Sequence, residues 1–589
     1  MTAPPPPNAP DTRSSAASLL AGLVLIAAFF ALRASTNGMF IALKNQWDFI
    51  SGGEGQFWAG AFAFLLPGAS LVGASLASRV EALSARVERA SASLDAWPTW
   101  AALFAVAAAY AAAGHAAVLH SMPITDDEGA ARFGGLLLAQ GRALTPLPPL
   151  WEAFPDLFLF RHAGRWGSVE FPGGIAAWAL AEVTHTGPLV FHLLAACAPL
   201  GVALAVRRAQ GAAWGLVAGA LVLASPAGAL LSFTTHTHVV SRGLLALAFA
   251  VILFVPRPSV TRAFAAGALL GAAFTARPAE SFALAAPLVL WHLARASRDR
   301  AQRPAAGAML AGLALMYALF QLYNRAVTGE FTMARDMPNE VFFHFNTLAR
   351  PMWEPSAIAH RFGSNVAYNA LMLWVFWLGP AGALLAVLGA RRSPEHTALA
   401  LGVALDLGVA LLHDDRGLHI VGPIHYAEAV VPLTVLAAAA LPRVEAACAR
   451  AGAATATVRG AALGYAGIGL ALFTAWQSLA LHEACANYAN MLGALTDTPR
   501  RPAVVLAPTV SAFRATLRSY ERRGGYVGAW PRARPDLRED VLVLLDSPKA
   551  RARVRRAFPD RTPYVFMLPP GRWGLQPLPE APAGSTREE

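Results

Sequence analysis

The chain has 589 residues, of which 56% are hydrophobic and 14% are charged. Because soluble domains are about one-quarter charged, this composition excludes an ordinary soluble protein and indicates a polytopic membrane protein. The net charge of +11 comes largely from arginines in short segments between apolar runs, which is typical of membrane orientation and argues against nucleic-acid binding. Cys197, Cys448 and Cys485 have no metal-ligand spacing, so neither a disulfide framework nor a zinc site is predicted.

Apolar segments of roughly bilayer length, about 20 residues, divide most of the chain into predicted membrane spans. The proline-rich stretch 1–15 before them is expected to be disordered. The windows predict about thirteen spans, at about 16–34, 57–77, 99–119, 188–206, 211–230, 241–256, 263–276, 280–295, 305–323, 366–390, 397–413, 427–441 and 460–481. The first is longer than a typical signal-peptide core and is interpreted as retained, with cleavage as the alternative.

Arginines mark one set of connections between these spans. They are Arg79, Arg86, Arg89, Arg207, Arg208, Arg257, Arg262, Arg295, Arg298, Arg300, Arg303, Arg391, Arg392, Arg443, Arg450 and Arg459. All lie on one side if the N-terminus is cytoplasmic, and the positive-inside rule makes that side the cytoplasm. The alternate connections are then external: 120–187, 231–240, 277–279, 324–365, 414–426 and everything after 482.

The tail after about residue 500 has a different character. The runs at 503–507, 541–546 and 564–568 are typical of buried strands, and the stretches 510–522 and 548–557 between them are typical of helices. Strands alternating with helices predict a small α/β domain. We therefore expect a mainly α, polytopic helical bundle: two spans and a cytoplasmic loop in 16–98, a membrane core in 99–482, and an external α/β domain in 500–589.

Thr125-Asp126-Asp127-Glu128 directly follows the third predicted span. The simplest interpretation is a helix capping box, in which Thr125 caps the helix and Glu128 reaches back to the cap. The functional interpretation is that the helix dipole keeps Asp127 ionised, ready to accept a proton from a hydroxyl group. The two interpretations are compatible, because a cap can also hold a base in position.

The external loop 120–187 carries further motifs in a fixed order. After Asp-Asp-Glu come Ala139-Gln-Gly-Arg142, the proline-rich run 146–149, Gly164-Arg165-Trp and Glu170-Phe-Pro-Gly-Gly174. This order resembles the first external loop of bacterial GT-C glycosyltransferases, the multi-span enzymes related to protein O-mannosyltransferases and to the aminoarabinose transferase of lipid A. Such enzymes transfer a sugar from a polyprenyl-phosphate lipid to an acceptor outside the membrane.

The resemblance extends over about 100–570 through shorter segments. They are an Arg-Pro element at Arg277, a Tyr-Asn…Thr-Gly segment that begins at Tyr323-Asn324, and Gly422-Pro-Ile-His425-Tyr426-Ala-Glu428. Ile424 replaces an arginine that is common in the last segment, and Ala131 replaces an aromatic residue often found three residues after the Asp-Glu pair. The first departure weakens a phosphate-binding role for that segment.

The resemblance implies that Asp127 is the catalytic aspartate and that Glu128 orients the acceptor or the base. The capping interpretation leaves Asp126 as a spare acid of the catalytic group. A departing phosphate also needs positive charge. The candidates are Arg277, Arg242, His236 and His238. Candidates for acceptor or sugar contacts are Arg165, Tyr426, His425 and Asn324. No cofactor is certain; a divalent metal is left open, since a His-x-His pair alone is weak evidence for one.

The predicted function is therefore a glycosyltransferase of the cytoplasmic (inner) membrane. Its partners are a polyprenyl-phosphate-linked sugar, an envelope acceptor (protein, glycan or lipid) and membrane lipid, with no nucleic acid. Other interpretations are a transporter, which calls for charged sites near the bilayer midplane such as Asp406, and a noncatalytic scaffold. His413-Asp414-Asp415 is a rival external carboxylate cluster, and snorkelling or interfacial exposure is the alternative for Arg277 and the histidine pair.

Overall fold

The computed structural model describes residues 12–35, 59–155, 158–337, 354–409, 411, 418–419, 421–508, 532–567 and 574–579. Within the described residues, each predicted span falls on one helix or on consecutive helical segments. The expected fold class, a mainly α bundle with a small C-terminal α/β domain, is confirmed. Helix α1 already begins at Thr12, inside the stretch 1–15 expected to be disordered.

In chain order the helices are α1 (Thr12–Ser35), η1 (Ala61–Leu65), α4 (Leu66–Ser75), α5 (Ala77–Arg89), α6 (Ser91–Leu94), α7 (Trp97–Ala117), α8 (Asp126–Ala139), η2 (Trp151–Ala153), α9 (Pro172–Val183), α10 (Leu189–Gln210), α11 (Ala212–Ala224), α12 (Pro226–Ser232), α13 (Thr237–Ile252), α14 (Val260–Ala276), α15 (Pro278–Arg298), η3 (Arg300–Gln302), α16 (Arg303–Thr328), η4 (Ala334–Asp336), α17 (Pro355–Arg361), η5 (Phe362–Ala367), α18 (Tyr368–Phe376), α19 (Pro380–Ala390), α20 (Pro394–Val409), η7 (Ile424–Tyr426), α21 (Val430–Arg450), α22 (Thr455–Leu463), η8 (Gly464–Leu470), α23 (Ala471–Thr496) and α25 (Pro548–Ala557). The strands are β1 (Thr145–Pro146), β2 (Leu159–His162), β3 (Arg165–Ser168), β4 (Leu418–His419), β5 (Gly422–Pro423), β6 (Ala503–Ala507), β7 (Val541–Leu545), β8 (Thr562–Met567) and β9 (Gly574–Pro577).

Six described helices are long and apolar enough to cross a membrane, or up to nine if each of three bent pairs is one span. Helices α13 and α14 are apolar but shorter. The number of spans therefore remains a prediction. The best-buried of the six include α10 and α21, while the candidate window of α1 is only 11% buried, as expected of a helix that presents most of its surface to lipid.

Small residues set the closest helix crossings. A Cβ on Gly73 of α4 would lie 2.0 Å from the carbonyl oxygen of Gly460 in α22, and one on Gly267 of α14 would lie 2.0 Å from that of Met309 in α16. Lipid tails are as apolar as leucine, so helices inside a bilayer gain their contact energy from such close packing. Larger side chains at these positions would force the helices apart.

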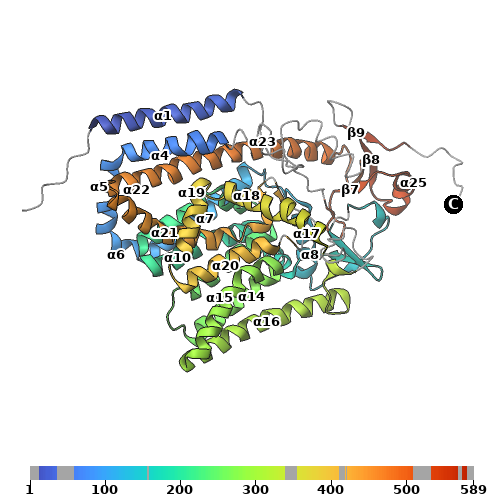
Figure 1. Ribbon diagram of the computed structural model, residues 1–589. Coiled ribbons are helices and arrows are strands. Elements are labelled where there is room, and N and C mark those ends of the chain that lie inside the picture. Colours follow the sequence, from blue (N-terminus) through green and yellow to red (C-terminus); the bar gives the residue numbers. More distant parts are fainter. Residues whose placement is uncertain are drawn as a thin grey trace, which may run out of the picture.

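The basic connections meet one another at one end of the bundle. Arg207 contacts Asp95, Arg208 donates to the Leu253 carbonyl, and Arg459 pairs with Glu88 and Glu445. The loop 120–187 and the C-terminal strands gather at the opposite end, around α8 (Figure 1). The two predicted sets of connections are thus separated in space; which end faces the outside is a prediction from the arginines.

The C-terminal domain is a four-stranded sheet of order β7-β6-β8-β9, in which β7, β6 and β8 are parallel and β9 is antiparallel. The predicted strands at 503–507, 541–546 and 564–568 and the helix at 548–557 are confirmed, β9 was not anticipated, and the helix expected at 510–522 lies outside the described residues. A smaller antiparallel sheet, β1-β3-β2, lies in the loop 120–187.

The C-terminal sheet and the loop 120–187 share one hydrophobic core. Phe133 and Leu137 of α8 pack with Trp166 of β3 and with Val504 of β6 and Phe558 of the C-terminal domain. Lys549 of α25 also pairs with Glu152 at 2.7 Å. The outer face of α8 is therefore held by the C-terminal domain.

We expect Phe154→Ala to loosen this shared core. Phe154 is 1% exposed and lies edge-on to Trp166 and Phe558, and truncating a buried phenylalanine costs about 3–5 kcal/mol. The variant should release a C-terminal fragment to protease faster and melt at a lower temperature in detergent. The control Met567→Ala, at an exposed position of β8, should change stability by no more than about 0.5 kcal/mol. Equal behaviour of the two variants would contradict the shared core.

Candidate functional site

Helix α8 begins in the capping box predicted from the sequence. The Thr125 hydroxyl accepts the Glu128 backbone N–H at 3.2 Å, and the Glu128 carboxylate accepts the Thr125 backbone N–H at 3.0 Å. The first turn carries three carboxylates, Asp126, Asp127 and Glu128, at the positive end of the helix dipole. This local geometry fixes the direction in which Asp127 points.

Glu128 does more than cap the helix. It is 1% exposed, and its second oxygen accepts the backbone N–H and the hydroxyl of Thr235 at 2.7 and 2.8 Å. The first oxygen also accepts the Ile124 N–H at 2.7 Å. Because both oxygens are engaged, Glu128 ties α8 to the segment before α13, and we assign it a positioning role rather than direct contact with a substrate.

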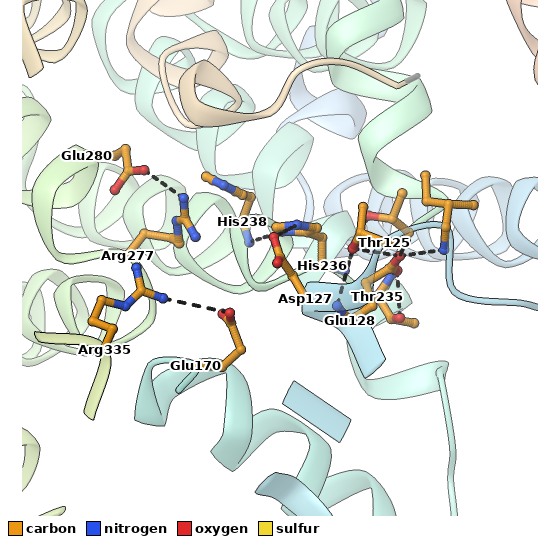
Figure 2. Close-up of polar contacts among 12 residues, drawn as sticks. Thr125, Asp127, Glu128, Glu170, Thr235, His236, His238, Arg277, Glu280 and Arg335 are labelled. Atoms are coloured by element: carbon orange, nitrogen blue, oxygen red, sulfur yellow. Dashed lines mark hydrogen bonds and ion pairs between the residues drawn. The ribbon is translucent and has the colours of Figure 1, made fainter. Parts of the chain in front are cut away.

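Asp127 lies beside His236, the residue that caps α13 (Figure 2). The ring Nε2 of His236 is 3.3 Å from Asp127 Oδ2, and its Nδ1 accepts the backbone N–H of His238. The proton of the neutral ring must then be on Nε2, which donates to Asp127. The Asp127 side chain is 22% exposed, so its carboxylate is both held and reachable.

The surrounding charges keep Asp127 ionised. Burial acts to raise the pKa of its carboxyl group, but the hydrogen bond from His236 and the positive charges of Arg277 and Arg335 together hold that pKa below its ordinary value. A carboxylate in this state is a weak base in water, and it becomes effective only through its position next to the group it deprotonates.

A second carboxyl group, that of Glu170, faces the same region. It is 4% exposed and directly precedes α9; its backbone N–H donates to Ser168. Arg335 of η4 lies 3.7 Å from Glu170 Oε1 and stacks 3.9 Å above the Phe171 ring. Burial, together with the charge of Asp127, raises the pKa of Glu170 above its ordinary value. Arg335 lies in no recognisable motif, so it was not predicted as a site residue from the sequence.

Arg277 forms the other cationic side of the site. It ends α14 and precedes Pro278 at the start of α15, and its guanidinium donates to Glu280 at 2.9 Å (Figure 2). A Cβ on Gly173 would lie 2.7 Å from the Ala276 backbone nitrogen, so the Phe-Pro-Gly-Gly motif lets α9 approach this junction closely. The structure thus brings Arg277 and Phe171 together, with the guanidinium 6.0 Å from the ring centre.

A histidine–glutamate network lies behind these groups. Nδ1 of His238 is 2.9 Å from Glu428, which also accepts the Ser241 hydroxyl. His238 is fully buried, and its ring stacks on those of His236 and His425 at 4.9 and 5.8 Å. The buried Tyr426 contacts Asn369. His236, His238 and His425 thus form one stack of rings, with Glu428 beside its middle member.

Other predicted site residues lie elsewhere. Arg242 is 0% exposed and donates to the Ala227 carbonyl at 3.1 Å and to Ser232 at 2.6 Å, so it holds α13 to α12 and cannot reach a phosphate from there. Arg165 is exposed in β3, opposite Pro146 and His162, and no contact joins it to Asp127 within the described part of the chain. We remove both from the site.

The remaining candidates are placed as follows. Asn324 is buried near the end of α16 and donates to Gln321 at 3.5 Å, and Asp126 is buried beside the cap. Asp406 is 0% exposed on α20, with no hydrogen-bond partner for its oxygens among the described residues. His413, Asp414 and Asp415 lie outside the described residues.

The described residues include no group of three histidine, cysteine, aspartate or glutamate side chains arranged to hold a metal ion. His236 and His238, the pair considered for such a site, instead use one ring nitrogen each to contact Asp127 and Glu428. The divalent metal left open by the sequence therefore has no set of ligands assigned here.

No family model matches the chain, and no curated protein matches its sequence. In overall structure it is similar to ArnT from Cupriavidus metallidurans in the apo state, with a TM-score of 0.48, 16% identity and coverage of 80% of this chain and 93% of that one. It is also similar to ArnT bound to undecaprenyl phosphate, with a TM-score of 0.43, 17% identity and coverage of 70% of this chain and 83% of that one. A third similar structure is the archaeal oligosaccharyltransferase AglB from Archaeoglobus fulgidus, in complex with an inhibitory peptide and a dolichol-phosphate. Its TM-score is 0.40 and its identity 15%, with coverage of 77% of this chain and 62% of that one.

We expect Glu128→Gln to destabilise the site. A glutamine must turn its NH₂ group toward one of the two sets of donors, and each buried donor left without an acceptor costs about 1–3 kcal/mol. The purified variant should melt at a lower temperature, whereas Glu152→Gln, which removes only an exposed pair with Lys549, should melt like the wild type. An unchanged melting temperature for Glu128→Gln would argue that its hydrogen bonds do not hold α8.

Proposed function

We propose that this protein is a membrane glycosyltransferase that moves a sugar from a polyprenyl-phosphate donor to a hydroxyl-bearing acceptor at the outer face of the cytoplasmic membrane. The observation that carries the proposal is a partly exposed Asp127 that contacts His236 and whose pKa is lowered by the charges of two arginines, Arg277 and Arg335, at one end of a membrane bundle. The order of motifs in the loop 120–187 supports the same reaction class.

Asp127 is the general base. A sugar phosphate already carries a good leaving group, so the reaction needs proton removal from the acceptor and stabilisation of the departing phosphate. The imidazole N–H of His236 fixes the orientation of the carboxylate, and the capping box fixes the helix that carries it. As the acceptor oxygen attacks the sugar, Asp127 takes its proton in a single displacement, the course that the family resemblance implies.

Arg277 and Arg335 provide the positive charge for the phosphate. The planar guanidinium group pairs with phosphate oxygens in a bidentate manner, and in a site that excludes water this attraction is far stronger than in bulk solvent. Each arginine is already held, Arg277 by Glu280 and Arg335 by Glu170 and the Phe171 ring. They are therefore preorganised before the donor lipid arrives.

The orientation follows from charge. The arginine-rich connections gather at the end of the bundle opposite Asp127, and basic connections remain cytoplasmic. This arrangement supports an N-terminus in the cytoplasm and a site and a C-terminal domain outside. The polyprenyl chain would then lie in the bilayer, with its phosphate at the level of Arg277.

Asp127→Asn should abolish transfer. Asparagine keeps the size of the side chain but cannot accept the acceptor proton, and a positioned base contributes roughly 10²–10⁴-fold to the rate. The measurement is transfer from a labelled donor lipid in membranes, with protein amount and melting temperature as controls. Asp299→Asn, which alters an exposed carboxylate in the arginine-rich 299–303 connection, should remain active. Full activity of Asp127→Asn would exclude Asp127 as the base.

Arg277→Gln should weaken donor binding. Hydrogen bonds to charged groups contribute about 1.5–3 kcal/mol, which corresponds to a roughly 10- to 100-fold higher Kd. Binding of a radiolabelled polyprenyl phosphate to the purified protein measures this directly. The matched control is Arg325→Gln in the last turn of α16, where the arginine stacks on Phe331. Equal affinities for the two variants would contradict a phosphate contact by Arg277.

A further inference from the structure

Two carboxyl groups, those of Asp127 and Glu170, lie in a largely buried region, where the charge of Asp127 affects the ionisation of Glu170. Glu170 is 4% exposed, and its Oε2 has no hydrogen-bond partner among the described residues, while Arg335 approaches Oε1 at 3.7 Å. Figure 2 shows its side chain pointing from the start of α9 toward Arg335, on the side of the site where Asp127 lies. The negative charge of Asp127 makes ionisation of the buried Glu170 more costly in a region of low dielectric, which favours retention of one proton by the two acids.

The groups around the pair decide which acid keeps that proton. Asp127 on α8 receives the His236 hydrogen bond from the start of α13 and faces both arginines. Glu170 faces Asp127, His236, Arg277 between α14 and α15, Arg335 on η4 and Tyr323 on α16. Within the described part of the chain, the cation that contacts it is Arg335, at a long 3.7 Å. Burial and the Asp127 charge outweigh these cations at Glu170, whereas the hydrogen bond and the cations prevail at Asp127. The raised pKa of Glu170 and the lowered pKa of Asp127 favour a proton on Glu170.

We propose that Glu170 is the acid partner of Asp127: it holds a proton in the resting site and delivers it to the departing phosphate. The inference rests on the proposed function, because it requires a phosphate at Arg277 and Arg335. Glu170 pairs with Arg335 itself, so a phosphate bound to that guanidinium would lie within reach of the Glu170 carboxyl group. Carboxyl groups held in different protonation states by their surroundings are a recurring acid–base arrangement.

The step balances in bonds and charge. The bond between the sugar carbon and the phosphate oxygen breaks, and the bond between that carbon and the acceptor oxygen forms. The acceptor proton passes to Asp127, and the Glu170 proton passes to a phosphate oxygen. The phosphodiester monoanion leaves as a hydrogen phosphate monoanion, so the charge summed over the two acids and the phosphate is the same before and after.

The pair then resets itself. After the step Asp127 carries a proton and Glu170 is ionised, which is the reverse of their preferred states. Transfer of the proton from Asp127 to Glu170, directly or through one water molecule, restores the resting site without exchange with bulk solvent. Glu170 thus accepts the proton that Asp127 took from the acceptor, and Asp127 is ionised again.

The resting proton can be tested without any substrate. In infrared spectra of the purified full-length protein at neutral pH, we expect a protonated-carboxyl band that is absent from Glu170→Gln and present in the control Glu182→Gln, whose exposed carboxylate pairs with Arg534. Asp127→Asn removes the neighbouring negative charge, so the Glu170 band should disappear at a lower pH. A spectrum in which Glu170→Gln removes no protonated band would overturn the inference, whatever the reaction of the enzyme.

The catalytic part is tested by rates against pH. In the wild type, kcat/KM should fall at low pH as Asp127 takes up a proton, and fall again at high pH, above the ordinary range of a glutamate, as Glu170 loses its proton. Glu170→Gln should lower kcat at least 10²-fold with donor binding little changed. The residual kcat/KM of this variant should not fall at high pH, whereas that of Glu170→Asp should still fall. Wild-type rates and an unaltered high-pH limb in Glu170→Gln would refute the acid role, while absence of transfer by the wild type would instead refute the proposed function.

Discussion

The site depends on one buried carboxylate that is not itself at the point of reaction. Glu128 accepts hydrogen bonds from the segment before α8 and from Thr235 before α13, and so joins the starts of two helices. Each of its donors would otherwise be an unpaired polar group in a region almost without solvent. Asp127 and His236 stand next to these joined residues in the chain. Their 3.3 Å contact is therefore a consequence of the Glu128 hydrogen bonds.

Charge in a poorly solvated region constrains the rest of the site. Arg277 donates to Glu280, Arg335 approaches Glu170 at 3.7 Å, and His238 contacts Glu428, so most ionisable groups there lie beside a group of the opposite kind. The exception is the closeness of two acids, Asp127 and Glu170, whose mutual repulsion is relieved by a proton. Such a region responds strongly to a phosphate, because every added charge is felt by all its neighbours at low dielectric.

The C-terminal domain contributes to this arrangement through its packing against α8. Its sheet buries the apolar face of α8, including Phe133 and Leu137, while the first turn of the same helix carries the acids. Packing on one face and hydrogen bonding at the N-terminus together leave α8 little freedom to move. Precise placement of a base is what a positioned carboxylate requires, because a small displacement weakens proton transfer.

Features that depend on neighbours in the chain were predictable from the sequence alone. Apolar runs must form helices in a bilayer because their backbone groups find no other partners, and the capping box joins Thr125 to a residue three positions away. The apolar runs of β6, β7 and β8 indicated the C-terminal sheet for a similar local reason. Tertiary structure alone decided the rest, since Glu128 meets Thr235 across 107 positions and His238 meets Glu428 across 190. Tertiary contacts make Arg242 a buried link between α13 and α12, and they bring Arg335 and Glu170 into the surroundings of Asp127. The role of a charged side chain in a buried region is set by the groups packed against it.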